Sequence, residues 1–285
     1  MVPHAWRRLA LVLLVGLLSA GDGQGSPAKV LRLATTTSTE DSGLLDAILP
    51  SFEQRCGCRV DVIAVGTGQA IALGRRGDAD ALLVHARALE EQFVAEGHGG
   101  PRQPVMYNDF VIVGPTDDPA QIAGVSSAAE AFRRIAARSA AFASRGDKSG
   151  THVAEQTIWQ AAGVSREGRW YRSVGQGMGE TLTLANEVPA YTLTDRGTWL
   201  SMRDRLGGLR LLVGGASPAE NQDRSLRNEY SVIVVSARKH PGVAEGLAQQ
   251  FARWLRSPAT QEAIARFGVQ RYGQALFHPD AGRQR

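Results

Sequence analysis

Cysteine and histidine are scarce in this sequence. Its 285 residues include six histidines and two cysteines, Cys56 and Cys58, which flank Gly57. Two sulfur ligands without a nearby histidine do not make a zinc site, so we expect no metal centre. In an oxidising compartment the two thiols can pair, although the loop between them is very tight. We expect either a local disulfide or two free thiols, with no catalytic role.

Aromatic residues and runs of like charge are also few. Aromatic side chains make up 6% of the chain, and its formal net charge of +4 is spread along the sequence. Nucleic-acid binding modules need aromatic platforms or clustered basic residues, so we predict no nucleic-acid partner. The basic excess indicates either a solvated surface or a preference for anions.

Long apolar runs are missing after the first residues. Arg7 and Arg8 precede about ten mostly apolar residues (9–18), and small residues follow as far as Ala28. That run is shorter than the roughly 20 residues that span a bilayer, and its order is typical of a secretory signal peptide. We predict a signal peptide over residues 1–28, cleaved after Ala20 or Ala28, and an exported monomer without a membrane anchor.

The remaining apolar residues recur alternately at strand and helix periods. The predicted strands are residues 30–34, 59–65, 79–84, 104–114, 141–143, 190–194, 210–213 and 230–236. The predicted helices are residues 44–52, 70–75, 86–96, 129–138, 152–162, 175–187, a segment after 198, 241–256 and 257–267.

Such alternation predicts an α/β fold with parallel strands. The elements form two groups, joined by one long strand and by a strand and linker that return. We predict that residues 29–109 form the first part of lobe I and residues 110–207 form lobe II. Residues 208–285 are expected to return and complete lobe I.

Three turns between a strand and a helix are rich in glycine and hydroxyl residues: Thr35–Thr39, Gly66–Gln69 and Ser144–Thr151. In parallel α/β sheets such turns line the ligand crevice, and helix N-termini there favour anions. One such turn is ordinary helix capping, but three in two lobes indicate an anion site. Within the third turn, Arg145 either donates to an oxyanion or forms a surface salt bridge with Asp147.

An ordered series of motifs extends this pattern from about Val30 to Arg256. The motifs occupy residues 34–44, 65–70, 77–80, 83–85, 107–114, 144–152, 170–171, 175–179 and 190–198. Together they resemble the TupA-type tungstate-binding proteins of bacterial ABC uptake systems. The sequence departs from that pattern at residues 227–230, Arg-Asn-Glu-Tyr, where the family is expected to have an Asn-Pro-Tyr-like turn.

The resemblance implies a two-lobed periplasmic binding protein of the class II type. Each lobe would be a mostly parallel sheet flanked by helices, with a hinge of two crossing segments. Such a protein binds tungstate, or the similar molybdate, between its lobes and delivers it to an ABC permease without a cofactor. The implied ligand contacts are Thr36, Thr37, Ser38, Thr67, Gly68, Arg145, Ser149, Gly150 and Thr151, with Asp147 and Thr194 as possible neighbours behind them.

Two other functions are compatible with parts of the sequence. The third turn also resembles the motif of phosphate-binding proteins, in which Asp147 would accept the proton that phosphate keeps at neutral pH. In a tungstate site Asp147 would instead turn away and brace Arg145. An enzyme would need a nucleophile with a base, and His85, His98 and His152 are available, but the sequence has no Gly-x-Ser-x-Gly elbow. We therefore expect a binding protein rather than a hydrolase or a ligand sensor.

Overall fold

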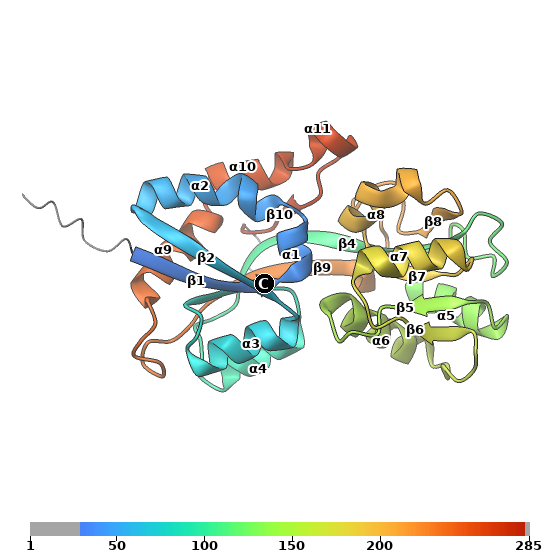
Figure 1. Ribbon diagram of the computed structural model, residues 1–285, viewed down its shortest axis with the longest axis horizontal. Helices are drawn as coiled ribbons and strands as arrows, with labels where there is room; N and C mark the ends of the chain where they lie inside the picture. Colours follow the sequence, from blue (N-terminus) through green and yellow to red (C-terminus); the bar gives the residue numbers. More distant parts are fainter. Residues whose placement is uncertain (1–28, 283–285) are drawn as a thin grey trace, which may run out of the picture.

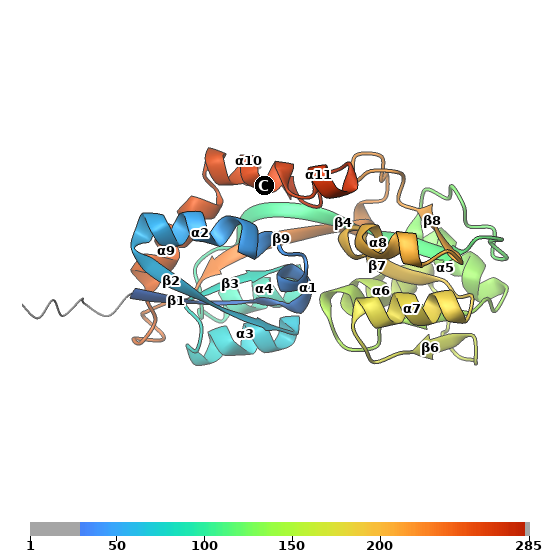
Figure 2. The ribbon, with the colours of Figure 1, turned by 45° about the horizontal axis from the view of Figure 1, so that its top comes forward.

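The protein has two lobes that are joined through a pair of long strands (Figure 1). A computed structural model describes residues 29–282, so the signal peptide predicted for residues 1–28 lies outside the described residues. Strands β4 (Gln103–Pro115) and β9 (Arg227–Val234) pass between the lobes side by side. Figure 2, turned by 45°, shows the same two strands connecting the lobes. The predicted two-lobed α/β architecture is confirmed.

Lobe I is built on three parallel strands whose carboxyl ends lie at one edge. They are β1 (Lys29–Thr36), β2 (Cys58–Val65) and β3 (Ala81–Val84). Strand β1 lies between the other two, with Thr36 opposite Val65 and Thr35 opposite Leu83. The turns that follow the three strands are therefore neighbours, as the sequence predicts.

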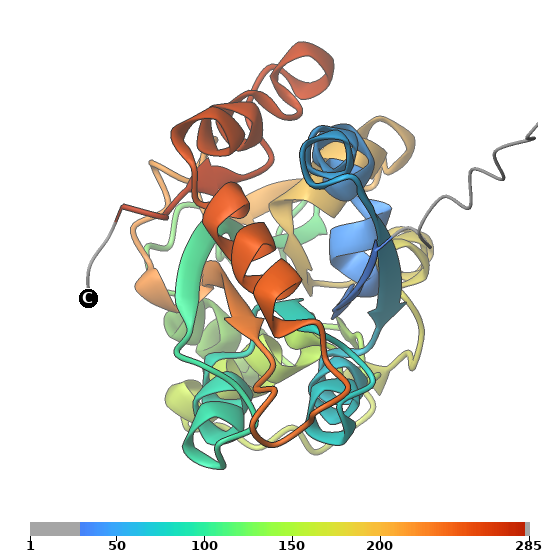
Figure 3. The same ribbon diagram turned by 90° about the vertical axis from the view of Figure 1, so that its left-hand side faces the viewer.

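Helices cover both faces of this sheet, as Figure 3 shows from the lobe I end. Apolar residues at helical spacing bury one face of each long helix, for example Leu45, Ile48 and Phe52. The helices of lobe I are α1 (Thr37–Asp41), α2 (Leu44–Cys56), α3 (Thr67–Arg76), α4 (Arg87–Ala95), α9 (Glu245–Leu255), α10 (Pro258–Arg266) and α11 (Val269–Tyr272).

Strand β4 belongs to both lobes because it changes partners along its length. It pairs antiparallel with β9 as far as Asp109, opposite Arg227. From Phe110 onward it pairs with β7 (Thr192–Asp195) and then with β8 (Leu209–Val213). A two-residue strand, β10 (His278–Pro279), adds to its lobe I half.

Lobe II contains a second, smaller group of parallel strands and an aromatic core. Strand β5 (Phe142–Ser144) pairs in parallel with β6 (Tyr171–Ser173). Phe132, Phe142 and Trp159 pack on one another with ring centroids 4.1–5.1 Å apart. The remaining elements are helices α5 (Ala128–Ala137), α6 (Gly150–Ala162), α7 (Met178–Glu187) and α8 (Arg196–Met202), and the short 3₁₀ turns η1 (Arg203–Arg205) and η2 (Arg224–Leu226).

Most predicted elements are present, and the differences have local causes. Strand β6 was not predicted, because Arg172 and Ser173 are exposed and its three residues have no alternating apolar pattern. Helix α9 begins at Glu245 rather than at Pro241, because residues 241–242 form a turn. Strand β8, which the predicted boundary places in the return segment, pairs with the lobe II half of β4.

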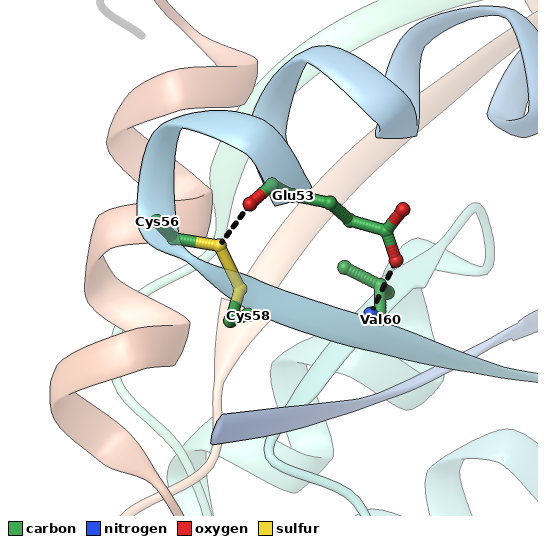
Figure 4. The surroundings of a disulfide bond; sticks show 4 residues. All are labelled: Glu53, Cys56, Cys58 and Val60. Carbon is green, nitrogen blue, oxygen red and sulfur yellow. Dashed lines mark hydrogen bonds between the residues drawn. A yellow bond between two sulfur atoms is a disulfide. The ribbon is translucent and has the colours of Figure 1, made fainter. Parts of the chain in front are cut away.

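Cys56 and Cys58 form a disulfide, which decides between the two alternatives left open by the sequence (Figure 4). It joins the end of α2 to the start of β2 across Gly57, whose φ of +58° is a left-handed value that favours glycine. The Glu53 carboxylate supports the same corner by accepting a hydrogen bond of 2.7 Å from the Val60 amide. The corner lies at the end of β2 opposite to the turn that follows Val65.

We predict that this disulfide contributes little to stability and nothing to ligand binding. Loop-closure entropy for so short a loop is only about 1–2 kcal/mol, so a Cys56→Ser, Cys58→Ser variant should lose about that much free energy of unfolding in urea. Adding a reductant to the wild type should reproduce the loss, and adding it to the variant should change nothing. A loss above about 4 kcal/mol, or an altered ligand affinity, would contradict the prediction.

Candidate functional site

Hydroxyl groups gather where β1 ends. Thr36 is 4% exposed, and its Oγ1 atom lies 3.1 Å from Ser38 Oγ and 2.8 Å from Thr39 Oγ1. Thr37, the first residue of α1, is exposed. Beside this turn the chain enters α3 at Thr67, because β2 is paired with β1 up to Val65. The first two predicted turns therefore form one polar edge of lobe I.

Thr67 has an unusual environment within this edge. It is 2% exposed, yet its Oγ1 atom has no hydrogen-bond partner among residues 29–282. An unpaired buried hydroxyl is costly, so this atom is suited to donate to a ligand or an ordered water. The next residue, Gly68, is exposed, and no atom would lie within 4 Å of a Cβ placed there. Space for a ligand is thus available beside α3.

His85 completes the polar edge, and the sequence interpretation did not include it among the ligand contacts. Its Nε2 atom lies 3.2 Å from Thr36 Oγ1 and its Nδ1 atom 2.9 Å from Asn228 Oδ1. Burial is the main cause that lowers its pKa to about 4, and the Arg145 guanidinium lowers it further. The ring is therefore neutral at neutral pH. Its position directly after β3, at the same edge as the predicted turns, was a signal that could have identified it.

The residues that depart from the expected family pattern hold this histidine in place. Asn228 donates from Nδ2 to Asn108 Oδ1 at 2.7 Å and to the Tyr230 hydroxyl at 3.2 Å. Both amide hydrogens are thereby used, and Asn228 Oδ1 is left to accept from His85. The Tyr230 ring packs on the His85 ring with centroids 4.6 Å apart. Strands β4 and β9 thus support the imidazole from the hinge.

In lobe II, the polar turn after β5 is organised by Asp147. Arg145 is 6% exposed, and its Nε donates to Asp147 Oδ2 at 2.8 Å. The other carboxylate oxygen accepts from the Ser149 amide at 3.0 Å. Ser149 caps α6 by accepting from the His152 amide at 3.3 Å. Asp147 therefore has both oxygens engaged within its own turn.

The two lobes meet where α6 begins. A Cβ placed on Gly150 would lie only 2.3 Å from Cε1 of His85, so the backbone of α6 approaches the imidazole as closely as glycine allows. The following residue, Thr151, is 3% exposed. Gly150, from the third predicted turn, is therefore in contact with the edge formed by the first two.

A cavity of about 620 Å³ opens between the lobes beside this contact. Lobe I contributes Thr37 and Ser38, and lobe II contributes Arg145, Asp147 and the start of α7. Of the described residues that line it, Arg145 is the one with a basic side chain. The side chains of the lining that could donate to an anion therefore include Arg145 and the α1 hydroxyls.

The lining of that cavity also contains acidic side chains. Asp41, Glu180 and Asp195 line it. Burial raises the pKa of the Asp41 carboxyl, the Arg145 guanidinium opposes that rise, and Glu180 and Asp195 add to it. These carboxylates oppose an anion, so Arg145 is the side chain of the lining whose charge attracts one.

The remaining predicted residues lie outside this cavity. Gly150 lines a second cavity, of about 1090 Å³, together with His85. Thr194, in β7, is fully buried, and its hydroxyl donates to the Asp195 carbonyl oxygen at 3.1 Å. The residues that line neither cavity are Thr36, Thr67, Gly68, Ser149, Thr151 and Thr194.

The described residues contain neither a cluster of metal-ligating side chains nor a membrane-spanning helix. Between residues 29 and 282, no three His, Cys, Asp or Glu side chains form a group that could hold a metal ion. No helix in the same range is both long and apolar enough to cross a membrane.

Comparisons with known proteins agree with this architecture. The profile of the PBP superfamily domain matches residues 22–259. The tungstate-binding protein TupA of Peptoclostridium acidaminophilum is 46% identical over 254 residues, which cover 88% of this chain and 86% of that protein.

Two solved structures are similar along most of the chain. The tungstate-binding protein TupA from Desulfovibrio alaskensis superimposes with a TM-score of 0.79 at 44% identity, covering 89% of this chain and 100% of that one. The tungstate ABC transporter structure from Geobacter sulfurreducens gives 0.73 at 48% identity, covering 82% of this chain and 97% of that one.

Proposed function

The chain belongs to the PBP superfamily and, within it, to the TupA-type solute-binding proteins of ABC transporters, and we propose that it captures tungstate between its lobes. The protein would be exported by means of its predicted signal peptide. Outside the cytoplasm it would then deliver the anion to a membrane permease. Molybdate, nearly the same in shape, is an expected second ligand. Binding and release are the whole activity, with no chemical step and no cofactor.

The observation that carries this proposal is the placement of Arg145. A guanidinium that is 6% exposed lines an inter-lobe cavity together with Thr37 and Ser38 of the other lobe. Charge-assisted hydrogen bonds from arginine, together with hydroxyls and helix N-termini, are the donors that a fully ionised oxyanion needs. We propose as ligand contacts Thr36, Thr37, Ser38, Thr67, Gly68, Arg145, Ser149, Gly150 and Thr151.

Asp147 favours tungstate over phosphate in this scheme. Protonated phosphate needs an acceptor directed at its proton, whereas the two oxygens of Asp147 are directed to Arg145 and to the Ser149 amide within its own turn. A carboxylate held in this way braces the arginine and pre-organises it for an anion that only accepts hydrogen bonds. We therefore assign Asp147 a supporting position and leave Thr194, which bonds within its own strand, outside the contact set.

Closure of the lobes would complete the site. We propose that lobe I comprises residues 29–109 with the return of the chain, and that lobe II begins at Phe110, where β4 exchanges its partner β9 for β7. Because the proposed contacts are divided between the lobes, the anion can make all of them only when the lobes are close together. The bound anion therefore favours the closed arrangement.

Calorimetric titration of the mature protein with four anions tests the function. We expect saturable heat with tungstate and molybdate, and none with phosphate or sulfate at the same concentrations, because the similar sequence and structure described above are those of tungstate-binding proteins. Titration of each anion into buffer is the control for heats of dilution, and denatured protein is the control for binding that does not need the fold. Binding of phosphate alone would refute the proposed ligand and restore Asp147 as a proton acceptor.

A further inference from the structure

His85 is the point at which the polar edge of lobe I touches lobe II. Its Cε1 atom faces Gly150, where a Cβ would be 2.3 Å away. His85 and Gly150 line the second cavity, while Ser38, bonded to Thr36 at the adjacent Nε2 atom of the ring, lines the first. The imidazole therefore lies in the wall between the cavities, beside the proposed anion site.

The ring is held so that it cannot move aside. With Asn228 Oδ1 fixed as an acceptor, Nδ1 of the neutral ring carries the proton and Nε2 accepts from the Thr36 hydroxyl. Tyr230 covers one face at 4.6 Å between centroids. Both nitrogens and a face are engaged, so Cε1, which lies between the nitrogens, points rigidly at the start of α6.

This geometry fixes how closely the two halves of the anion site can approach. Helix α6 carries the proposed backbone donors of lobe II at its first turn, and its closest neighbour across the lobes is the His85 ring. The Thr36 hydroxyl of lobe I bonds to Nε2, the ring atom next to Cε1. The edge of the imidazole thus limits how near the start of α6 can come to that hydroxyl.

We propose that His85 is a specificity-determining spacer, which sets the distance between the lobes so that the donors fit a large tetrahedral oxyanion better than a small one. The inference rests on the proposed function, because it concerns the size selectivity of that same site. Tungstate and molybdate have longer bonds to oxygen than sulfate and phosphate. A cleft held apart by an imidazole leaves the smaller anions unable to reach both lobes.

Two replacements of His85 separate spacing from simple loss of a side chain. In His85→Asn the amide can still donate to Asn228, but the part of the ring that faces Gly150 is gone, so α6 can come closer. In His85→Gln the longer amide reaches toward Thr36 and fills most of the same space. His98→Asn is the matched control, because His98 bonds to His240 within lobe I.

The experiment measures the dissociation constant of tungstate for the wild type and the three variants. The dissociation constant of sulfate is measured for the same four proteins by displacement of tungstate. Thermal unfolding verifies that each protein is folded. We expect His85→Asn to shift the ratio of the two constants toward sulfate by about tenfold or more, as loss of a fitted group does. His85→Gln should stay within about threefold of the wild type, and His98→Asn should not differ from it.

If the wild type binds tungstate, either of two results would refute the role of His85 as a spacer. One is an unchanged ratio of the two dissociation constants in His85→Asn. The other is an equal loss of affinity for both anions in both His85→Asn and His85→Gln, which indicates a general structural role. A wild type that does not bind tungstate would instead refute the proposed function, and the spacer with it.

Discussion

Replacing Arg145 by alanine should weaken tungstate binding by about 10- to 100-fold. A hydrogen bond to a charged group contributes about 1.5–3 kcal/mol, and about 1.4 kcal/mol corresponds to a factor of ten in affinity. Arg145 is nearly buried and lines the inter-lobe cavity, so water cannot replace it fully. Calorimetric titration of the variant measures the effect directly.

The loss has a second cause, which a matched variant can separate. Without the guanidinium, Asp147 loses its 2.8 Å partner and faces the cavity as an unbalanced carboxylate. Arg145→Ala combined with Asp147→Asn removes that repulsion and should recover part of the affinity. Arg145→Lys keeps the charge but not the planar fork of donors, so it should bind with intermediate strength. An unchanged affinity in Arg145→Ala would remove the arginine from the site.

The sequence predicted that the polar turns of lobe I are neighbours, and the structure confirms it, because strand ends can be identified from one segment at a time. Thr36 and Thr67 follow two apolar strands at helix starts, and parallel pairing brings such turns together. Arg145 was predicted in the same way, because it lies in a polar turn that directly follows strand β5. Those inferences need only local periodicity and one rule about the edges of parallel sheets.

The parts that the sequence missed depend on contacts between distant segments. His85 is supported by Asn228, which is 143 residues away, and its contact with Gly150 joins the two lobes. The acidic lining of the first cavity combines Asp41 with Glu180 and Asp195, and no single segment carries that pattern. The pairing of β8 with β4 could not be predicted either, because the sequence of a five-residue strand does not specify which strand it pairs with.

A single methyl group added at Gly150 should impair binding as severely as the loss of Arg145. Gly150 has an ordinary negative φ and is the first residue of α6, so Gly150→Ala is compatible with the helix and should leave the stability of lobe II unchanged or slightly higher. The new Cβ would lie 2.3 Å from a ring that is held at both nitrogens. The lobes must then separate, and we expect tungstate affinity to fall about tenfold or more without a loss of thermal stability.

Combining that substitution with His85→Asn distinguishes steric separation of the lobes from damage to α6. If the methyl group acts only by pushing against the imidazole, removing the imidazole creates room for it, and the double variant should bind tungstate better than Gly150→Ala alone. The two effects would then be strongly non-additive, as expected for residues in direct contact. Additive losses in the four titrations would contradict the contact and assign the effect of Gly150→Ala to its own backbone amide. Recovery in the double variant would mean that the packing of one glycine on one histidine controls how far the cleft closes.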